Sequence, residues 1–301
     1  MPAASAAPGA SEGRWAWCPG SDGMGVILGL MAALAFGTSD FVAGAGGRRA
    51  DAIAITAIAQ PFGLLAALAG VVILGGGSPT PSALEWGALS GVGSGLGTVA
   101  LYWGLSAGAM NIVSPLAAVI SAVVPALVGV ALGERLSLLA LIGIVLAVPA
   151  LTLVSLAGGQ TPAARASAVP VAAGLAAGGG FALLFIGLAR AGTTASAWPL
   201  VPGQSIAIII VLLFVAARRP ARSAWRASSR WGLAAGPLSG AANLLYLAAT
   251  GQGQLAVVAV LAALYPAVTV ALAAGLLHER MGRLQAVGLV MAAVSVAMIS
   301  V

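Results

Sequence analysis

The chain matches itself when it is displaced by 145 residues, which predicts two copies of one structural unit. Glu134-Arg135 recurs as Glu279-Arg280 (279 minus 134), and Trp86-Gly87 recurs as Trp231-Gly232. Other identical pairs at this offset are Gly29 and Gly174, Phe36 and Phe181, Gly91 and Gly236, Ser94 and Ser239, Gly95 and Gly240, Gly108 and Gly253, and Gly143 and Gly288. Solenoids and propellers have repeats of about 20–50 residues, so this much longer period indicates a duplicated domain.

The composition predicts an integral membrane protein. Of the 301 residues, 60% are hydrophobic and only 7% are charged, whereas soluble domains carry roughly 25% charged residues. The single cysteine, Cys18, and the single histidine, His278, exclude a disulfide framework and a cysteine or histidine metal site. We therefore expect no metal and no cofactor. Nucleic acid is excluded as a partner because the chain has no basic domain interleaved with aromatic residues.

Uncharged stretches long enough to cross a bilayer, about 20 residues each, predict an all-α protein with ten transmembrane helices. Long unbroken apolar runs exclude a β-barrel. Residues 1–23 are expected to form a disordered tail, 24–157 the first repeat, 158–168 a linker and 169–301 the second repeat. The expected helices are 24–44, 52–74, 84–106, 111–132, 137–157, 169–189, 196–216, 231–250, 255–277 and 283–301.

Five helices per unit predict an inverted repeat, because an odd number makes the second unit enter the membrane from the opposite side. The even total places both termini on one side. That side carries three arginines and the other carries ten, and basic loops favour the cytoplasm. The arginine count therefore predicts that the termini lie outside.

Two of the expected helices, 84–106 and 231–250, each carry a glycine stripe and a polar stripe. Spacing of four places small residues along one helix face, where two backbones can approach closely, so we expect the glycines to serve helix packing. The polar residues are expected either to line a central cavity or to bond neighbouring helices. The polar residues of the two stripes are Ser94, Thr98, Tyr102, Ser239, Asn243, Tyr246 and Thr250.

Asp40 is the only acidic residue clearly inside an expected span. A carboxylate within the membrane is costly and marks a functional site by default. It is expected either to bind substrate or a coupling proton, or to pair with Arg48 or Arg49 about two turns away. Its repeat counterpart is the apolar Phe185, which makes any such site asymmetric.

Several further residues have weaker signals. Ser39, Gln60 and Tyr265 are candidate cavity residues, and Gln204 is a candidate cavity donor. Tyr265 precedes Pro266, where a helix kink is expected. Glu134 and Glu279 are interpreted as structural, because each precedes a helix whose N-terminal dipole favours a negative charge.

The chain resembles the drug/metabolite transporter superfamily, in its EamA-like branch. The residues that carry the resemblance are Leu132 to Ser137, Leu277 to Met281, Ala35 to Ser39 and Leu264 to Pro266. The resemblance implies two inverted five-helix repeats and export or exchange of small metabolites, often amino acids. It implies a central cavity formed by 24–44, 84–106, 111–132, 169–189, 231–250 and 255–277. It also implies cytoplasmic termini, contrary to the arginine count. Phe36 stands where the family usually has tryptophan.

The predicted function is secondary active transport of small metabolites by alternating access, in the inner (plasma) membrane. The expected partners are a small-molecule substrate, the lipid bilayer and a coupling proton, with the protein acting as a monomer or homodimer. A scaffold or channel subunit is the main alternative. A membrane-embedded enzyme is less favoured, because the spans carry no cluster of nucleophile and base.

Overall fold

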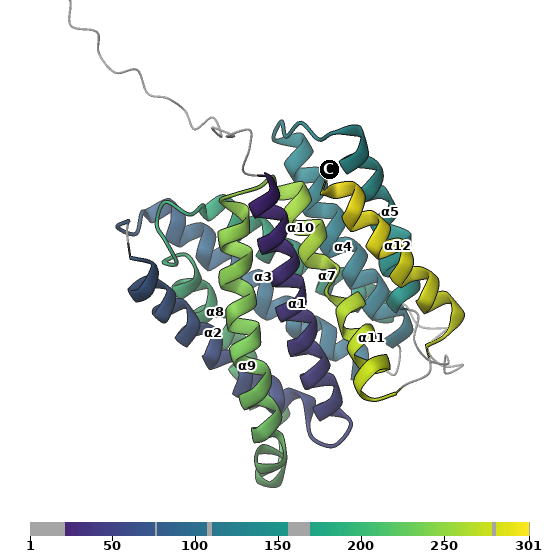
Figure 1. Ribbon diagram of the computed structural model, residues 1–301. Helices are drawn as coiled ribbons and strands as arrows, with labels where there is room; N and C mark the ends of the chain where they lie inside the picture. Colours follow the sequence, from purple (N-terminus) through teal and green to yellow (C-terminus); the bar gives the residue numbers. More distant parts are fainter. Residues whose placement is uncertain (1–21, 76, 107–109, 156–168, 279–280, 301) are drawn as a thin grey trace, which may run out of the picture.

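The computed structural model describes residues 22–75, 77–106, 110–155, 169–278 and 281–300. Nearly all of the expected tail and all of the expected linker fall outside these ranges. Within them the chain forms helices and no strand (Figure 1). The first half contains α1 (Asp22–Gly47), α2 (Ala52–Leu74), α3 (Pro81–Ser106), α4 (Met110–Ala131) and α5 (Leu138–Ser155). The second half contains α7 (Val169–Ala191), α8 (Leu200–Arg218), α9 (Arg222–Thr250), α10 (Leu255–Ala263), α11 (Tyr265–Leu276) and α12 (Arg283–Ile299).

Seven helical segments of the described chain are long and apolar enough to cross a membrane, with α10 and α11 counted together. The shorter α12 is apolar as well. The two long helices outside this group are α3 and α9, which carry the polar stripes and, in α9, three arginines. The most polar long helices are therefore those predicted to line the centre of the protein.

The expected helix 255–277 is interrupted at Leu264, which separates α10 from α11. Pro266 lies in the first turn of α11 and has no N–H to donate to the preceding turn. The prediction of one continuous helix was wrong at this point.

The bounds of α8 and α9 also differ from the expected ones. Residues 194–199 form turns, and Ser196 has a positive φ of 51°, so α8 begins at Leu200 and not at 196. In the other direction, α9 begins at Arg222, nine residues before the expected start. Its first turns carry arginines and serines, which lower the local hydropathy without preventing helix formation.

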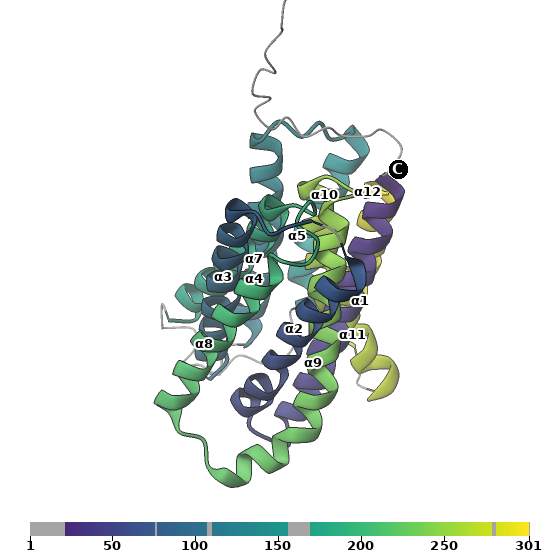
Figure 2. The same ribbon diagram turned by 90° about the vertical axis from the view of Figure 1, so that its left-hand side faces the viewer.

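The most extensive helix contacts join the two halves. α3 packs on α7 and α8, and its repeat counterpart α9 packs on α1 and α2 (Figure 2). Likewise α4 packs on α7, α1 packs on α10 and α11, and α5 packs on α12. The repeat counterparts are α1 and α7, α2 and α8, α3 and α9, α4 and α10–α11, and α5 and α12. Exchanging each helix for its counterpart gives the same set of contacting pairs. Neither half forms a core by itself, because each buries its helices against the other.

Contacts along the helices fix their relative directions. Gly25 near the start of α1 lies against Gly253, just after α9, and Gly46 near the end of α1 lies against Trp231 in α9. These two helices are therefore antiparallel. The equivalent pair, α3 and α7, is antiparallel too, because Gly93 contacts Gly180 while Trp86 contacts Gly187.

The two glycine stripes lie at helix contacts, which confirms the packing prediction. Gly87 and Gly91 of α3 lie against Pro199 and Gly203, and Gly232 and Gly236 of α9 lie against α2. A Cβ on Gly91 would sit 2.1 Å from the carbonyl oxygen of Gly203. Only glycine permits this backbone approach.

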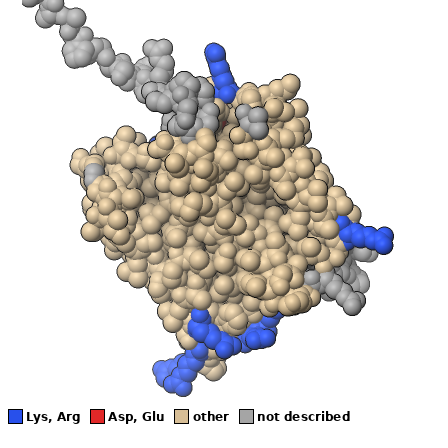
Figure 3. Space-filling view, in the orientation of Figure 1, with Lys and Arg blue, Asp and Glu red and all other residues tan. Residues whose placement is uncertain are grey.

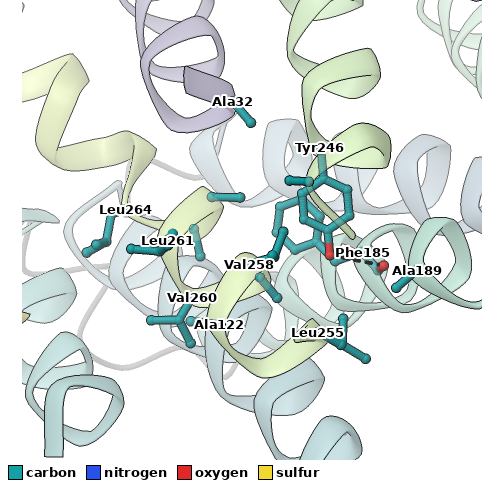
Figure 4. Packing of buried hydrophobic residues seen from close by; sticks show 14 of the residues in the cluster. Ala32, Ala122, Phe185, Ala189, Tyr246, Leu255, Val258, Val260, Leu261 and Leu264 are labelled. Atoms are coloured by element: carbon teal, nitrogen blue, oxygen red, sulfur yellow. Dashed lines mark hydrogen bonds between the residues drawn. The ribbon is translucent and has the colours of Figure 1, made fainter. Parts of the chain in front are cut away.

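The packed core lies toward the end of the molecule that holds the start of α1 and the C-terminus (Figure 1). Every residue of α10 except the partly buried Val257 is buried there. Figure 4 shows α10 side chains gathered around Tyr246 and Phe185. The outer faces, by contrast, expose large apolar side chains such as Val72, 81% exposed, as expected for contact with lipid.

The opposite end of the molecule is basic. Figure 3 shows arginines gathered at the lower end of the view, and a broad band without charged residues above them. The connection between α8 and α9 contributes Arg218, Arg219 and Arg222, all exposed.

Candidate functional site

A polar cavity of about 170 Å³ lies between the two halves. The first half contributes residues of α1, α2 and α3, and the second contributes residues of α7, α8, α9 and α11. Nine of the ten residues predicted from the sequence line it: Ser39, Asp40, Gln60, Ser94, Thr98, Tyr102, Ser239, Asn243 and Tyr265. The structure thus brings together residues that lie up to 226 positions apart (265 minus 39).

One face of α1 enters the cavity. Phe36, Ser39, Asp40 and Ala43 are spaced three or four apart, so they share that face. The Ser39 hydroxyl donates to the carbonyl oxygen of Ala235, 3.0 Å away, and so fastens α1 to α9. Asp40 is exposed to the cavity, and no arginine is among the lining residues described. The cavity therefore has the Asp40 carboxylate as its one charged group.

The wall formed by α2 and α3 contains a residue that the sequence analysis missed. Thr56 lines the cavity and hydrogen-bonds to the hydroxyl of Tyr102 across the two helices. Its own hydroxyl also lies 3.0 Å from the carbonyl oxygen of Ala52. Thr56 precedes Gln60 by one helical turn, and that spacing was the available signal.

The α9 wall carries an acceptor without a partner. Asn243 is 7% exposed, and its Nδ2 donates to the carbonyl oxygen of Ser239 at 2.9 Å. Its Oδ1 is buried without a hydrogen-bond partner in the described part of the protein. Since a buried polar atom without a partner is unfavourable, this oxygen is an unused hydrogen-bond acceptor in the cavity wall.

Aromatic rings form the remaining wall. The ring of Phe36 lies 6.4 Å from that of Phe185 and 6.4 Å from that of Tyr265, measured between centroids. Phe181 lies one turn before Phe185 and also lines the cavity. The site therefore combines one carboxylate, several hydroxyls and amides, and a continuous aromatic surface. Small-molecule sites typically have this composition.

The model of the EamA-like transporter family matches residues 23–156 and again 166–301. The chain belongs to this family. Its members are transporters, which supports a non-enzymatic function. A solved crystal structure superposes on the chain with a TM-score of 0.69 at 17% sequence identity, covering 92% of this chain and 98% of the other. This likeness concerns the fold alone. No similar protein is found among curated proteins.

The cavity of this EamA-like protein differs from the one implied by the family resemblance. It includes Gln60 and Thr56 from α2 and Gln204 from α8, and none of the α4 side chains that the structure describes lines it. Gln204 is buried and extends toward Gly63 of α2. The absence of a side chain at Gly63 makes room for it.

Tyr246 was predicted to be a site residue but does not line the cavity. It is fully buried beyond it, with its ring 4.6 Å from that of Phe185. Its hydroxyl donates to the carbonyl oxygen of Phe185 at 3.1 Å. Tyr246 thus supports the aromatic wall from behind.

Glu134, in the family's Glu-Arg motif, has a structural role that differs from the expected one. Its carboxylate accepts hydrogen bonds from the backbone N–H groups of Leu255 and Ala256, at 2.6 and 2.9 Å. It therefore caps α10 of the other half, while Ser137 caps α5. Burial raises the pKa of Glu134, and the two N–H donors oppose that rise. The equivalent Glu279 lies outside the described residues.

Proposed function

We propose that this protein is a secondary active transporter that moves small polar or amphipathic metabolites, amino acids or related solutes, out of the cell. Its location is the inner (plasma) membrane. The observation that carries the proposal is the cavity between the halves, which combines polar and aromatic residues at the depth of the membrane-spanning helices. Family membership supports transport as the general activity.

Alternating access requires two units that can rock against each other. We propose ten spans, with α10 and α11 as one, arranged as inverted repeats over 24–157 and 169–301. The antiparallel pairs α1–α9 and α3–α7 support the inversion, and the exchange of equivalent contacts supports the pseudo-twofold axis. Because the axis relates the two halves, a cavity that opens to one side of the membrane has a potential counterpart that opens to the other side.

A carrier fits these features better than a channel. The cavity is lined by the second halves of α1 and α3, the first half of α2 and the middle of α9, toward the arginine-rich end. Toward the other end, α10 and the last turns of α9 are packed into the core. A channel needs a continuous aqueous path, whereas a carrier is closed on one side at any time.

We propose the proton as coupling ion, with Asp40 as the group that binds it. Asp40 is the one carboxylate among the lining residues, and intramembrane carboxylates serve as proton relays in many transporters. Transport driven by an imposed pH gradient is expected to disappear in the Asp40→Asn variant.

Counterflow in proteoliposomes tests the transport function. Vesicles loaded with an unlabelled solute are expected to accumulate the labelled solute transiently and saturably, over a panel of amines, amino acids and other metabolites. Ala43→Phe, which fills the cavity, is expected to slow this exchange about ten-fold or more, as an overpacked site loses binding energy. The matched control is Leu34→Phe, on the lipid-facing side of α1, where Leu34 is 55% exposed. Equal slowing by both variants, or flux that never saturates, would contradict the proposal.

A further inference from the structure

We propose that the cavity selects a small organic amine in its protonated ammonium form, and that it discriminates against solutes carrying a carboxylate. The inference rests on the proposed transport function and narrows its substrate class. It follows from the charge, the hydrogen-bonding groups and the shape of the lining.

The charge of the cavity lining favours a cation. The lining has a single charged side chain, Asp40, and no basic group among the described residues. An ionised carboxylate away from bulk water is unfavourable unless a cation offsets it. A bound ammonium group supplies that cation. The carboxylate of an amino acid would find no positive partner here and would be repelled by Asp40.

The hydrogen-bonding groups point to a donor. The Asp40 carboxylate can only accept hydrogen bonds when ionised, and the unpartnered Oδ1 of Asn243 is a second acceptor. The hydroxyls in the lining both donate and accept, so they do not restrict the ligand. A primary ammonium group has three N–H donors for such acceptors. A quaternary ammonium group has none.

The aromatic wall fits both ends of an amine. Phe36 lies one helical turn from Asp40 on the same face of α1, so a cation held by the carboxylate is close to an aromatic side chain. Phe185 occupies the repeat position equivalent to Asp40 (185 minus 40 equals 145) and also lines the cavity. The duplication thus places a charge on one side of the pseudo-axis and a ring on the other.

The size of the cavity limits the apolar part of the substrate. A cavity of about 150 Å³ in another protein takes up benzene, and this one measures about 170 Å³. An ammonium group attached to one ring, or an aliphatic group of similar volume, fits in the conformation described.

Equilibrium binding to the purified full-length protein tests the inference with four probes that share a benzyl group. They are benzylammonium, benzyl alcohol, phenylglycine and benzyltrimethylammonium, at neutral pH, where the amines are charged. Phenylglycine is benzylammonium with an added carboxylate. We expect benzylammonium to bind at least about ten-fold more tightly than the other three, the factor associated with one charged contact.

Three variants test whether Asp40 is the residue that causes the preference for benzylammonium. Asp40→Asn is expected to remove the preference for benzylammonium over benzyl alcohol, whereas Asp40→Glu is expected to keep the order of affinities. Glu85→Gln makes the same charge change at an exposed position of α3 and is expected to leave all affinities within about two-fold, as for surface substitutions. If Asp40→Asn does not fold, the order in the wild type and in Asp40→Glu still tests the inference.

The inference is overturned if benzylammonium does not bind, if benzyl alcohol or phenylglycine binds as tightly, or if Asp40→Asn keeps the preference. Equal binding of benzyltrimethylammonium overturns the requirement for an N–H donor. The proposed transport function fails separately: binding with the expected order, but without counterflow of any solute, contradicts transport and leaves the charge preference standing. Counterflow of another solute without amine binding contradicts the substrate class alone.

Discussion

At the scale of single residues, glycines determine how closely the two halves approach. Gly91 and Gly203 bring α3 and α8 into backbone contact, and the equivalent Gly236 meets α2. This contact places the polar face of α3, with Ser94 and Thr98, next to the cavity. Close packing and the position of the site therefore depend on the same residues.

We expect Gly91→Ala to destabilise the protein by about 3 kcal/mol, the upper range for overpacking a core, because the new methyl group meets the backbone of α8. Gly179→Ala is the matched control, since nothing lies within 4 Å of a Cβ at that exposed helical position. Gly179→Ala is expected to be neutral or to stabilise by up to about 1 kcal/mol. Thermal unfolding in detergent measures both, and equal effects would argue against the close contact.

Most of the cavity lining could be predicted from the sequence, because polar residues in a membrane segment must face the interior. Thr98, Ser239 and Asn243 illustrate this. Tyr246 could not be placed in the same way: it shares the helix face of Ser239, but the cavity ends before it. The periodicity of polar residues predicts which face of a helix points inward. It does not predict how far along the helix the cavity extends.

At the scale of helices, the Glu134 cap links the halves. The loop after α4 belongs to the first half, and the capped helix α10 belongs to the second. The N-cap residue of α10, Gln254, makes no side-chain cap of its own. Instead its amide donates to the carbonyl oxygen of Arg135 at 3.2 Å. The end of the molecule that holds the packed core is thus held together partly by this reciprocal contact.

We expect Glu134→Gln to lower the stability by about 0.5–2 kcal/mol, the range for losing a helix cap. Burial raises the pKa of Glu134, so the folded protein holds this proton more tightly than the unfolded chain. The stability that the group contributes is then greatest below the usual pKa of glutamate and declines as the pH rises through the folded value. The difference in Tm between the wild type and Glu134→Gln should therefore shrink with rising pH. A difference in Tm that stays constant with pH would mean that the pKa of Glu134 is not raised. The control variant Glu85→Gln is expected to have the same Tm as the wild type.

The helices themselves were predicted with different success for physical reasons. Apolar length located α2 and α7 within a few residues. It failed at the start of α9, where arginines and serines extend the helix beyond the apolar segment. It also missed the interruption at Leu264, because a proline such as Pro115 or Pro125 stays within the continuous α4. The tertiary packing around a proline, and not its presence, decides whether the helix breaks.

At the scale of the whole molecule, the pairing of helices between the halves is the main feature. The offset of 145 residues predicted the duplication, and the family match covers both copies. The family resemblance did not imply that α2 and α8 would line the cavity, although Gln60 and Gln204 were predicted as cavity residues and do line it. That arrangement depends on the angles at which the helices cross, which small residues at the contacts determine.

The proposed inversion predicts that equivalent loops lie on opposite sides of the membrane. Arg49 and Thr194 occupy equivalent exposed positions (194 minus 49 equals 145). In a variant with Cys18 replaced by serine, we expect a single cysteine at 49 and a single cysteine at 194 to react with a membrane-impermeant thiol reagent from opposite sides. Labelling in intact cells and in lysed cells measures this. Labelling of both positions from one side would contradict the inversion.

The interruption at Leu264 divides one membrane crossing into parts with unlike surroundings. Eight of the nine residues of α10 are buried, whereas α11 has no buried residue. A continuous helix resists bending along its whole hydrogen-bond ladder, but here the ladder is already open at one residue. The interruption therefore separates a buried segment, α10, from a peripheral one, α11, within a single crossing. The counterpart, α4, is continuous from Met110 to Ala131 although it contains two prolines, so the two halves differ at this position.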